Sequence, residues 1–239
     1  MKIKFIGTGT CIDTKRTQSC ILIESNETKV LVDIGVGSFT RLENYNDIDA
    51  VLITHHHLDH NGDLLALLKA RWLSNADELR IYGPSGTRVV IESLLEAYPY
   101  LRRKLRFKVI EDPEFRIGDL EIKTMPTIHS ITSRAYIIKK DEKIVVVSGD
   151  TKPFKDLMSV RCDILIHEMS LPFGYKSEDH TTPESFATLL KYCNADIIYL
   201  THMYPNAREV KDDIVNYLKR FKRDIEIEVA EDSLTLRIT

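Results

Sequence analysis

Short hydrophobic runs of strand length alternate along the chain with longer segments in which hydrophobic residues recur at helical spacing. The strand-like runs are rich in Ile, Val and Leu, and polar or glycine-containing turns separate them. The predicted strands cover Lys2–Ile6, Cys20–Glu24, Lys29–Val32, Ala50–Ile53, Leu79–Tyr82, Leu120–Thr124, Ala135–Lys139, Lys143–Val147, Asp163–Ile166, Asp196–Leu200, Ile225–Val229 and Leu234–Ile238.

Helical spacing predicts helices over residues 64–73, 87–98, 183–192 and 209–221. Asp63 is placed to cap the first helix, and Thr182 puts a capping hydroxyl before Pro183, at the first helical position of the third. Because early and late strands cluster around interleaved helices, we expect two sheets that pack together and are covered by helices. The predicted fold class is therefore an α/β sandwich.

The composition is that of an ordinary globular protein, with 43% hydrophobic and 29% charged residues, which excludes disordered and fibrous chains. The formal net charge of −3 gives no overall attraction to nucleic acid or to an anionic membrane. No stretch rich in Gly, Ser or Pro divides the 239 residues, so we expect a single domain over residues 1–239.

The N-terminal segment and the cysteines favour a cytoplasmic protein. The first residues read as a strand rather than a signal peptide, and no hydrophobic run approaches the roughly 18 residues that span a bilayer. Cys11, Cys20, Cys162 and Cys193 are scattered without a C-x-x-C pair, which favours reduced packing residues over a disulfide framework. We therefore expect no membrane partner.

The strongest chemical signal is the segment Thr54–His60, which directly follows a predicted strand and precedes a predicted helix. It contains the potential metal ligands His55, His57, Asp59 and His60. A loop, unlike a regular strand or helix, can turn several nearly consecutive side chains toward one point. Imidazole nitrogens and carboxylate oxygens suit zinc and neighbouring transition metals, so the segment predicts a metal site.

Other predicted strands run into residues that could serve the same site. Asp150, Glu168 and His202 come at or just after the ends of such strands, and His129 follows another a few residues later. In open α/β sheets, ligands collect beyond the carboxyl ends of the strands. Each of these residues alone is a weak signal, but together they agree with the histidine-rich loop.

The number of potential ligands indicates two metal ions. The candidate ligands are His55, His57, Asp59, His60, His129, Asp150 and His202. One catalytic zinc takes three protein ligands and keeps an open position, so this set is too large for one ion. Asp150 is the natural shared carboxylate, because it stands alone at a strand end between two sets of histidines. We expect two divalent ions, Zn²⁺ in the first place, with Mn²⁺ or Fe²⁺ as alternatives.

The spacing H-x-H-x-D-H of the loop resembles the signature of the metallo-β-lactamase superfamily. Within it the chain most resembles the ribonuclease Z-like phosphodiesterases, over nearly its whole length. The segments that carry the resemblance are residues 5–10, 31–35, 55–60, 81–84, 163–168, 179–182 and 228–232. The resemblance implies the metallo-β-lactamase fold, an αββα sandwich of two mixed β-sheets covered by helices.

The resemblance also implies a role for each site residue. It assigns His55, His57 and His129 to one metal and Asp59, His60 and His202 to the other, with Asp150 as the bridge. It makes Glu168 and His180 an acid–base pair, groups Asp59 with them as a catalytic residue, and gives Asp33 a structural place near the metal loop.

The implied reaction is phosphodiester hydrolysis. A hydroxide that bridges the two metals would attack phosphorus, and the metals would neutralise charge on the non-bridging oxygens. A protonated His180, oriented by Glu168, would supply a proton to the leaving alkoxide.

Two departures from the family pattern bear on the substrate. Only residues 130–149 separate His129 from Asp150, and they read as a hairpin, which leaves no room for the arm that family members use to bind transfer RNA. Ala135 and Met169 also replace small residues usual in the family. We therefore expect a small or cyclic phosphodiester or an RNA end as substrate, and not typical transfer-RNA 3′ processing.

Other contacts and functions remain open at this point. The basic residues between Arg102 and Lys108 form either an RNA-binding patch or a solvated face, and Ser133 and Arg134 are candidates to contact a substrate phosphate. The alternative functions are hydrolysis of a carbonyl ester, thioester or lactone, and transfer-RNA 3′ endonuclease activity. A non-catalytic RNA-binding protein is disfavoured because no ligand is missing. Relatives of this kind often dimerise, so we expect a homodimer.

Overall fold

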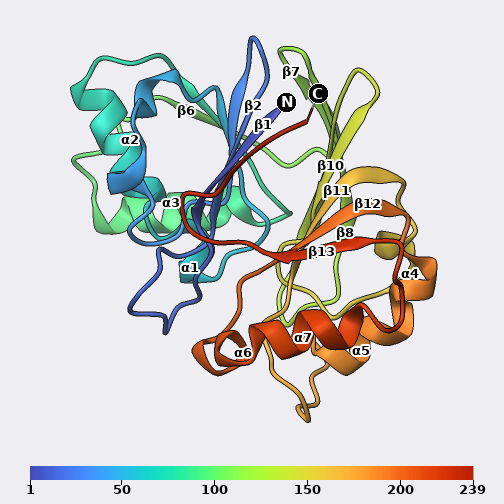
Figure 1. The fold of residues 1–239 in the computed structure, drawn as a ribbon. Helices are drawn as coiled ribbons and strands as arrows, with labels where there is room; N and C mark the ends of the chain where they lie inside the picture. Colours follow the sequence, from blue (N-terminus) through green and yellow to red (C-terminus); the bar gives the residue numbers. More distant parts are fainter. Residues whose placement is uncertain (239) are drawn as a thin grey trace.

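The hydrophobic runs of the N-terminal half pair into a seven-stranded sheet in the computed structural model, which describes residues 1–238 (Figure 1). In spatial order its strands are β14 (Thr235–Arg237), β1 (Lys2–Gly7), β2 (Cys20–Glu24), β3 (Lys29–Val32), β4 (Ala50–Leu52), β5 (Leu79–Tyr82) and β6 (Phe107–Ile110). The pairs from β14 to β3 are antiparallel and those from β3 to β6 are parallel. The first sheet is therefore mixed, as predicted.

The second seven-stranded sheet is built mainly by the C-terminal half. In spatial order its strands are β13 (Glu226–Val229), β12 (Ala195–Thr201), β11 (Cys162–Glu168), β10 (Lys143–Val147), β9 (Arg134–Lys140), β8 (Leu120–Pro126) and β7 (Glu114–Ile117). The pairs from β10 to β13 are parallel, and those from β7 to β10 are antiparallel. The strands β9 and β10 form the hairpin expected between His129 and Asp150.

Three buried clusters give the molecule its four layers. The central cluster lies between the two sheets, where Phe5 of the first sheet and Tyr136 and Ile166 of the second are fully buried. A second cluster packs α2 (Leu64–Leu73) and α3 (Thr87–Ala97) on the outer face of the first sheet. The third packs α4 (Lys155–Met158), α5 (Pro183–Leu189) and α7 (Lys211–Leu218) on the second sheet (Figure 1). The predicted αββα sandwich is confirmed.

The remaining helices are short. They are α1 (Leu58–Asn61), α6 (Pro205–Glu209) and the 3₁₀ turns Phe39–Arg41, Tyr45–Asp47 and Leu190–Tyr192. Thr182 caps α5 through the predicted hydroxyl, which accepts a hydrogen bond from the Ser185 amide. None of the described helices is long and hydrophobic enough to cross a bilayer.

The structure corrects three local predictions. Two strands, β6 and β7, were not predicted, because both are short edge strands with charged residues among their hydrophobic ones. The helix predicted over residues 209–221 is shorter, α7 over Lys211–Leu218, and an unpredicted helix, α6, precedes it and ends before Val210, whose ψ of 22° breaks the helical path. Asp63 precedes α2 but does not cap it, because its carboxylate accepts a hydrogen bond from the Phe39 amide.

Candidate metal centre

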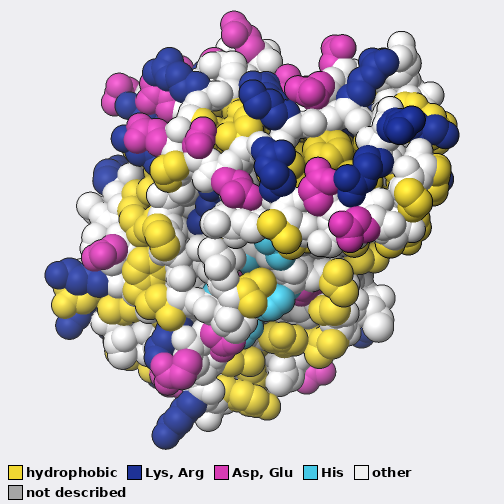
Figure 2. Space-filling view, turned by 180° about the vertical axis from the view of Figure 1, so that it is seen from behind, with side chains coloured by type: hydrophobic (Ala, Val, Ile, Leu, Met, Phe, Trp, Pro, Cys, Tyr) yellow, Lys and Arg dark blue, Asp and Glu magenta, His cyan; other side chains and the backbone are white. Residues whose placement is uncertain are grey.

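The carboxyl ends of strands from both sheets bring the predicted ligands to one end of the sandwich. The loop after β4 carries His55, His57, Asp59 and His60, and the segment after β12 carries His202. Asp150 follows β10 after Gly149, whose φ of +60° turns the chain where a Cβ would meet Thr54 at 2.8 Å. Figure 2 shows histidine side chains in a hollow that hydrophobic side chains surround.

The first group of ligands comprises His55, His57, His129 and Asp150. Nε2 of His55 lies 3.0 Å from Nδ1 of His57, and Nε2 of His129 lies 3.1 Å from the same atom. The Nδ1–H of His129 donates to the Asp179 carbonyl at 3.0 Å, which leaves its Nε2 lone pair facing the group. These nitrogens converge on one point, as ligands of a single ion would.

The second group comprises Asp59, His60 and His202, all buried. Nε2 of His202 lies 3.2 Å from Nε2 of His60 and 3.3 Å from an Asp59 oxygen. Asp150 lies between the two groups, with Oδ2 3.8 Å from Nε2 of His55 and Oδ1 3.3 Å from Nε2 of His60. One carboxylate therefore presents one oxygen to each group.

The chemistry of this donor set fits divalent cations. The Asp33 carboxylate accepts the Nδ1–H of His60, so Nε2 of His60 faces Nε2 of His202 with a lone pair. Oδ1 of Asp150 is buried and accepts no hydrogen bond from the described residues. Closely spaced imidazole nitrogens and a buried carboxylate oxygen without a hydrogen bond are costly unless a positive charge, on a ring or on a bound ion, lies among them. A cation in each group would remove that cost.

Outer residues hold the ligands in place. Asp33, whose φ is 60°, bonds both His60 and the hydroxyl of Thr54. His202 also has a positive φ of 53°, and its amide donates to the carbonyl of Thr8. A non-glycine residue in this conformation is strained, and such strain persists where surrounding bonds over-determine it. The expectation that Asp33 is structural agrees with these contacts.

Electrostatics keep the Asp59 carboxyl ionised. Burial by itself would raise its pKa, but the hydrogen bond from His202 and the nearby His60 outweigh burial and lower the pKa to about 2. The Asp59 carboxylate also accepts the Cys11 amide at 2.9 Å. This anchors the loop after β1 beside the metal ligands.

His180 and Glu168 form the pair that the resemblance implied. The His180 Nδ1 lies 2.9 Å from a Glu168 oxygen, and Glu168 is 1% exposed. The amides of Thr151, Ser170 and Thr181 donate to the two Glu168 oxygens and fix the carboxylate. Burial by itself would lower the pKa of His180, but the hydrogen bond and charge of Glu168 raise it to about 9. His180 is therefore protonated at neutral pH.

The structure buries Ser133 and Arg134, the two residues that the sequence offers as contacts to a substrate phosphate. Arg134 is 5% exposed, and its guanidinium donates to the Tyr136 hydroxyl at 2.9 Å and to the Asp112 carbonyl at 3.2 Å. The Ser133 hydroxyl lies 2.5 Å from that of Thr127 and is also buried. Both side chains make hydrogen bonds within the protein. Arg134 is the first residue of β9, and its side chain points into the interior.

The basic segment after α3 is engaged with its own surroundings. Arg102 pairs with Glu92 at 3.3 Å, and the Lys104 ammonium lies 4.8 Å from the ring centre of Trp72. These contacts are those of a solvated surface, and RNA binding by this segment stays a prediction.

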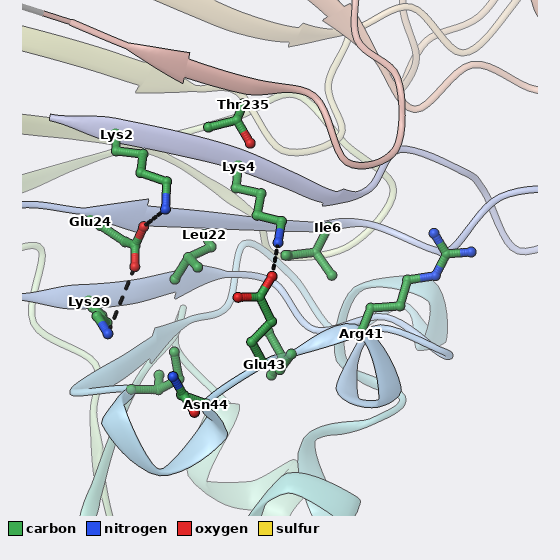
Figure 3. Close-up of a pocket in the computed structure, with 12 residues that line it drawn as sticks. Lys2, Lys4, Ile6, Leu22, Glu24, Lys29, Arg41, Glu43, Asn44 and Thr235 are labelled. Carbon is green, nitrogen blue, oxygen red and sulfur yellow. Dashed lines mark hydrogen bonds and ion pairs between the residues drawn. The ribbon is translucent and has the colours of Figure 1, made fainter.

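A second hollow, of about 130 Å³, lies over strands β1 to β3 (Figure 3). The three lysines on its wall are ion-paired: Lys2 and Lys29 with Glu24 at 2.5 and 3.9 Å, and Lys4 with Glu43 at 2.7 Å. Because these cations are already neutralised, the hollow is a poor site for an anionic substrate.

Sequence reasoning missed the residues that surround His180. The ring of Tyr204 lies 6.3 Å from the ring of His180 at an interplanar angle of 85°. Ile12, 64% exposed, and Leu171 line the same hollow. The only sequence signal was that Tyr204 stands two positions after the ligand His202, at the start of a short helix.

Comparison with known proteins agrees with this site and fold. The family model described as anti-Pycsar protein Apyc1 matches residues 1–222. The chain belongs to this family. It is also 28% identical to the ribonuclease Z of Methanopyrus kandleri over 84% of this chain and 86% of that protein. The ribonuclease Z of Mycolicibacterium gilvum is 27% identical, over 97% of this chain and 94% of that one.

Solved structures confirm the architecture. The metallo-β-lactamase fold protein YhfI of Bacillus subtilis superposes with a TM-score of 0.84 at 24% identity, covering 98% of each chain. The short form of human tRNase Z gives a TM-score of 0.81 at 24% identity, covering all of both chains. The chain therefore has the metallo-β-lactamase fold and is similar to the ribonucleases Z, and the predicted resemblance is confirmed.

Proposed function

We propose that the protein is a dinuclear, metal-dependent phosphodiesterase that acts on small or cyclic phosphodiesters. It is a metal-dependent hydrolase of phosphodiester bonds. One observation carries the dinuclear assignment: the Asp150 carboxylate stands between two separate groups of ligands. Zn²⁺ suits both groups because histidine nitrogens predominate, and Mn²⁺ and Fe²⁺ accept the same donors.

The first group would hold one ion through His55, His57 and His129, and the second would hold the other through Asp59, His60 and His202. When bound, such ions lower the pKa of water for attack on phosphorus and neutralise charge on the phosphate oxygens.

His180 completes the reaction as general acid. As water adds to phosphorus, the bond from phosphorus to the leaving oxygen breaks, and that oxygen takes the proton of His180. The proton lost by the attacking water restores the imidazolium. Glu168 holds the ring and its charge in place at 2.9 Å. Proton transfer of this kind contributes about 10²–10⁴-fold to the rate.

The hairpin of β9 and β10 supports a small substrate. It fills the interval between His129 and Asp150 in which the resemblance to ribonuclease Z-like enzymes implies a transfer-RNA-binding arm, and it turns directly at Asp141 and Glu142. The buried Arg134 also offers no exposed guanidinium to a long phosphate backbone.

Metal analysis and turnover test the proposal. Purified protein should contain about two divalent ions per chain and should hydrolyse bis(p-nitrophenyl) phosphate and a cyclic nucleotide, but not a precursor transfer RNA. Asp150→Ala should abolish turnover, and Asp119→Ala, far along the sheet from the ligands, serves as the matched control. Full activity of Asp150→Ala would overturn the metal mechanism, and turnover of thioesters alone would assign the protein to carbonyl hydrolysis.

We further propose that the protein is a cytoplasmic homodimer with a single domain over residues 1–239. All four cysteines are free thiols, which suits a reducing compartment. Light scattering from size-exclusion chromatography would measure the mass, and a mass of one chain would contradict the dimer.

A further inference from the structure

Ser170 is a buried serine that belongs neither to the ligands nor to the acid–base pair, and it bonds to both. It lies just after the end of β11. Its amide donates to Oε2 of Glu168 at 2.8 Å, and its hydroxyl donates to the carbonyl of His202 at 3.0 Å. One residue therefore connects the acid–base pair with a ligand of the second group.

The backbone of His202 is held from both sheets. Its φ of 53° is uncommon for a residue other than glycine. The His202 amide donates to the carbonyl of Thr8, which follows β1 of the first sheet, and the His202 carbonyl accepts the hydroxyl of Ser170, which follows β11 of the second. A strained conformation persists where surrounding bonds fix it in this way, so the Ser170 hydroxyl supplies half of that restraint.

The same hydroxyl decides which ring nitrogen of His202 carries the hydrogen. A hydroxyl has one hydrogen, and that of Ser170 goes to the carbonyl, so its oxygen is left to accept the Nδ1–H of His202 at 3.3 Å. Oδ1 of Asp150 lies at the same distance from Nδ1 but accepts no hydrogen bond from the described residues. With the hydrogen on Nδ1, Nε2 keeps its lone pair. Nε2 is the atom that lies 3.2 Å from Nε2 of His60 and 3.3 Å from an Asp59 oxygen.

The other histidine of the second group has a partner of the same kind. The Asp33 carboxylate accepts the Nδ1–H of His60 at 2.7 Å. Partners behind metal-binding histidines fix the tautomer and orient the ring, and their loss weakens metal binding. By its contacts, Ser170 stands to His202 as Asp33 stands to His60, and it holds the backbone of the ligand as well.

We propose that Ser170 is a positioning residue whose hydroxyl holds His202 in the backbone conformation and the tautomer that the second metal ion requires. The inference rests on the proposed dinuclear function, and it adds a residue that controls one of the two ions. Ser170 is not itself a ligand.

Metal titration of Ser170→Ala tests the proposal. The substitution removes the hydroxyl but keeps the amide that donates to Glu168, so the acid–base pair is retained. Competition with a chromogenic chelator should show one Zn²⁺ ion bound as in wild type and the other bound about 10- to 100-fold more weakly. With bis(p-nitrophenyl) phosphate, kcat of the variant should rise with Zn²⁺ over a range in which wild type is already saturated. A general loss of stability would not produce this dependence on metal.

Two further variants separate the hydroxyl from an unspecific effect. Ser38→Ala is the matched control, because Ser38 is equally buried and its hydroxyl donates to the Gln18 carbonyl at 3.2 Å. It should bind both ions as wild type does. Ser170→Thr keeps the hydroxyl and should also retain both ions.

A measurement on wild type does not depend on the folding of any variant. In zinc-loaded protein with ¹⁵N-labelled histidine, the Nδ1–H of His202 should give a signal that exchanges slowly with water, because the hydrogen bond to Ser170 protects it. The absence of this signal from His202→Gln would assign it. A ring hydrogen found on Nε2 of His202 contradicts the proposal.

The titrations distinguish the role of Ser170 from the proposed function. If Ser170→Ala binds both ions as tightly as wild type, or loses both to the same extent, the role of Ser170 is overturned while the dinuclear enzyme stands. The same weakening in Ser38→Ala or Ser170→Thr overturns it too. Wild type that binds a single ion, or that shows no metal-dependent turnover of a phosphodiester, overturns the proposed function itself.

Discussion

The Asp33 carboxylate accepts a hydrogen bond from Nδ1 of His60 at 2.7 Å, and both residues are buried. This contact fixes the tautomer of His60 and points Nε2 toward His202 and Asp150. A carboxylate behind a metal-binding histidine orients the ring and raises its basicity as a ligand. Asp33 thus controls the second group of ligands without belonging to it.

Asp33→Asn should therefore weaken metal binding by about 10- to 100-fold. The amide keeps the size of the side chain, but it carries no charge and binds the Nδ1–H more weakly. Competitive titration with a chromogenic chelator would measure the affinity. Asp119→Asn, which loses a surface carboxylate near Thr28 and Lys140, should bind metal as wild type does. An unchanged metal affinity of Asp33→Asn would show that Asp33 does not support the binding of metal by His60.

His180→Gln should slow the reaction according to the leaving group. With a cyclic nucleotide the leaving alkoxide needs a proton, and kcat should fall about 10²–10⁴-fold. With bis(p-nitrophenyl) phosphate the leaving phenolate is stable without one, so the loss should be about tenfold or less. The ratio of the two losses is the measurement, and equal losses would speak against a general acid.

Glu168→Gln should change the pH profile of the reaction. The Glu168 charge raises the pKa of His180 to about 9, so the acid is present below that pH and lost above it. Without the Glu168 charge, burial of His180 is opposed only by the charges of Asp150 and Asp179, so its pKa falls. The alkaline limb of kcat for the cyclic substrate should therefore move from near pH 9 to lower pH. A limb that stays in place would contradict the coupling of the two side chains.

The same pair should make stability depend on pH. Because the pKa of His180 is higher in the folded than in the unfolded chain, its contribution is complete below about pH 6.5 and is lost as the pH rises through about 9. The Tm difference between wild type and His180→Gln should shrink across this interval. A difference that is constant between pH 6 and pH 10 would show that the ion pair does not stabilise the fold.

Arg134→Met should destabilise the protein with little effect on turnover. The guanidinium donates to the buried Tyr136 hydroxyl and to the Asp112 carbonyl, and the substitution removes both hydrogen bonds. The expected cost is about 1–3 kcal/mol in the free energy of unfolding, measured with urea. A large rise in KM with unchanged stability would instead return Arg134 to the role of phosphate contact.

Much of the fold and of the metal centre could be predicted from local sequence. The period-2 runs indicated most strands, because burial of one or both faces demands hydrophobic residues there. The loop from His55 to His60 indicated a metal site, because four potential ligands within six residues are rare outside metal-binding loops. The edge strands β6 and β7 were not predicted, because the charged residues of an edge strand interrupt the hydrophobic alternation that indicates a strand.

Only the tertiary structure decided how distant residues act on one another. It turned Arg134 into the interior, placed the Asp150 oxygens between two groups of ligands, and set Tyr204 against His180. The sequence by itself determined which residues have the chemistry to bind metal and move a proton. Their distances depend on how the two sheets pack and how each loop turns, and these depend on contacts between residues that are far apart in the chain.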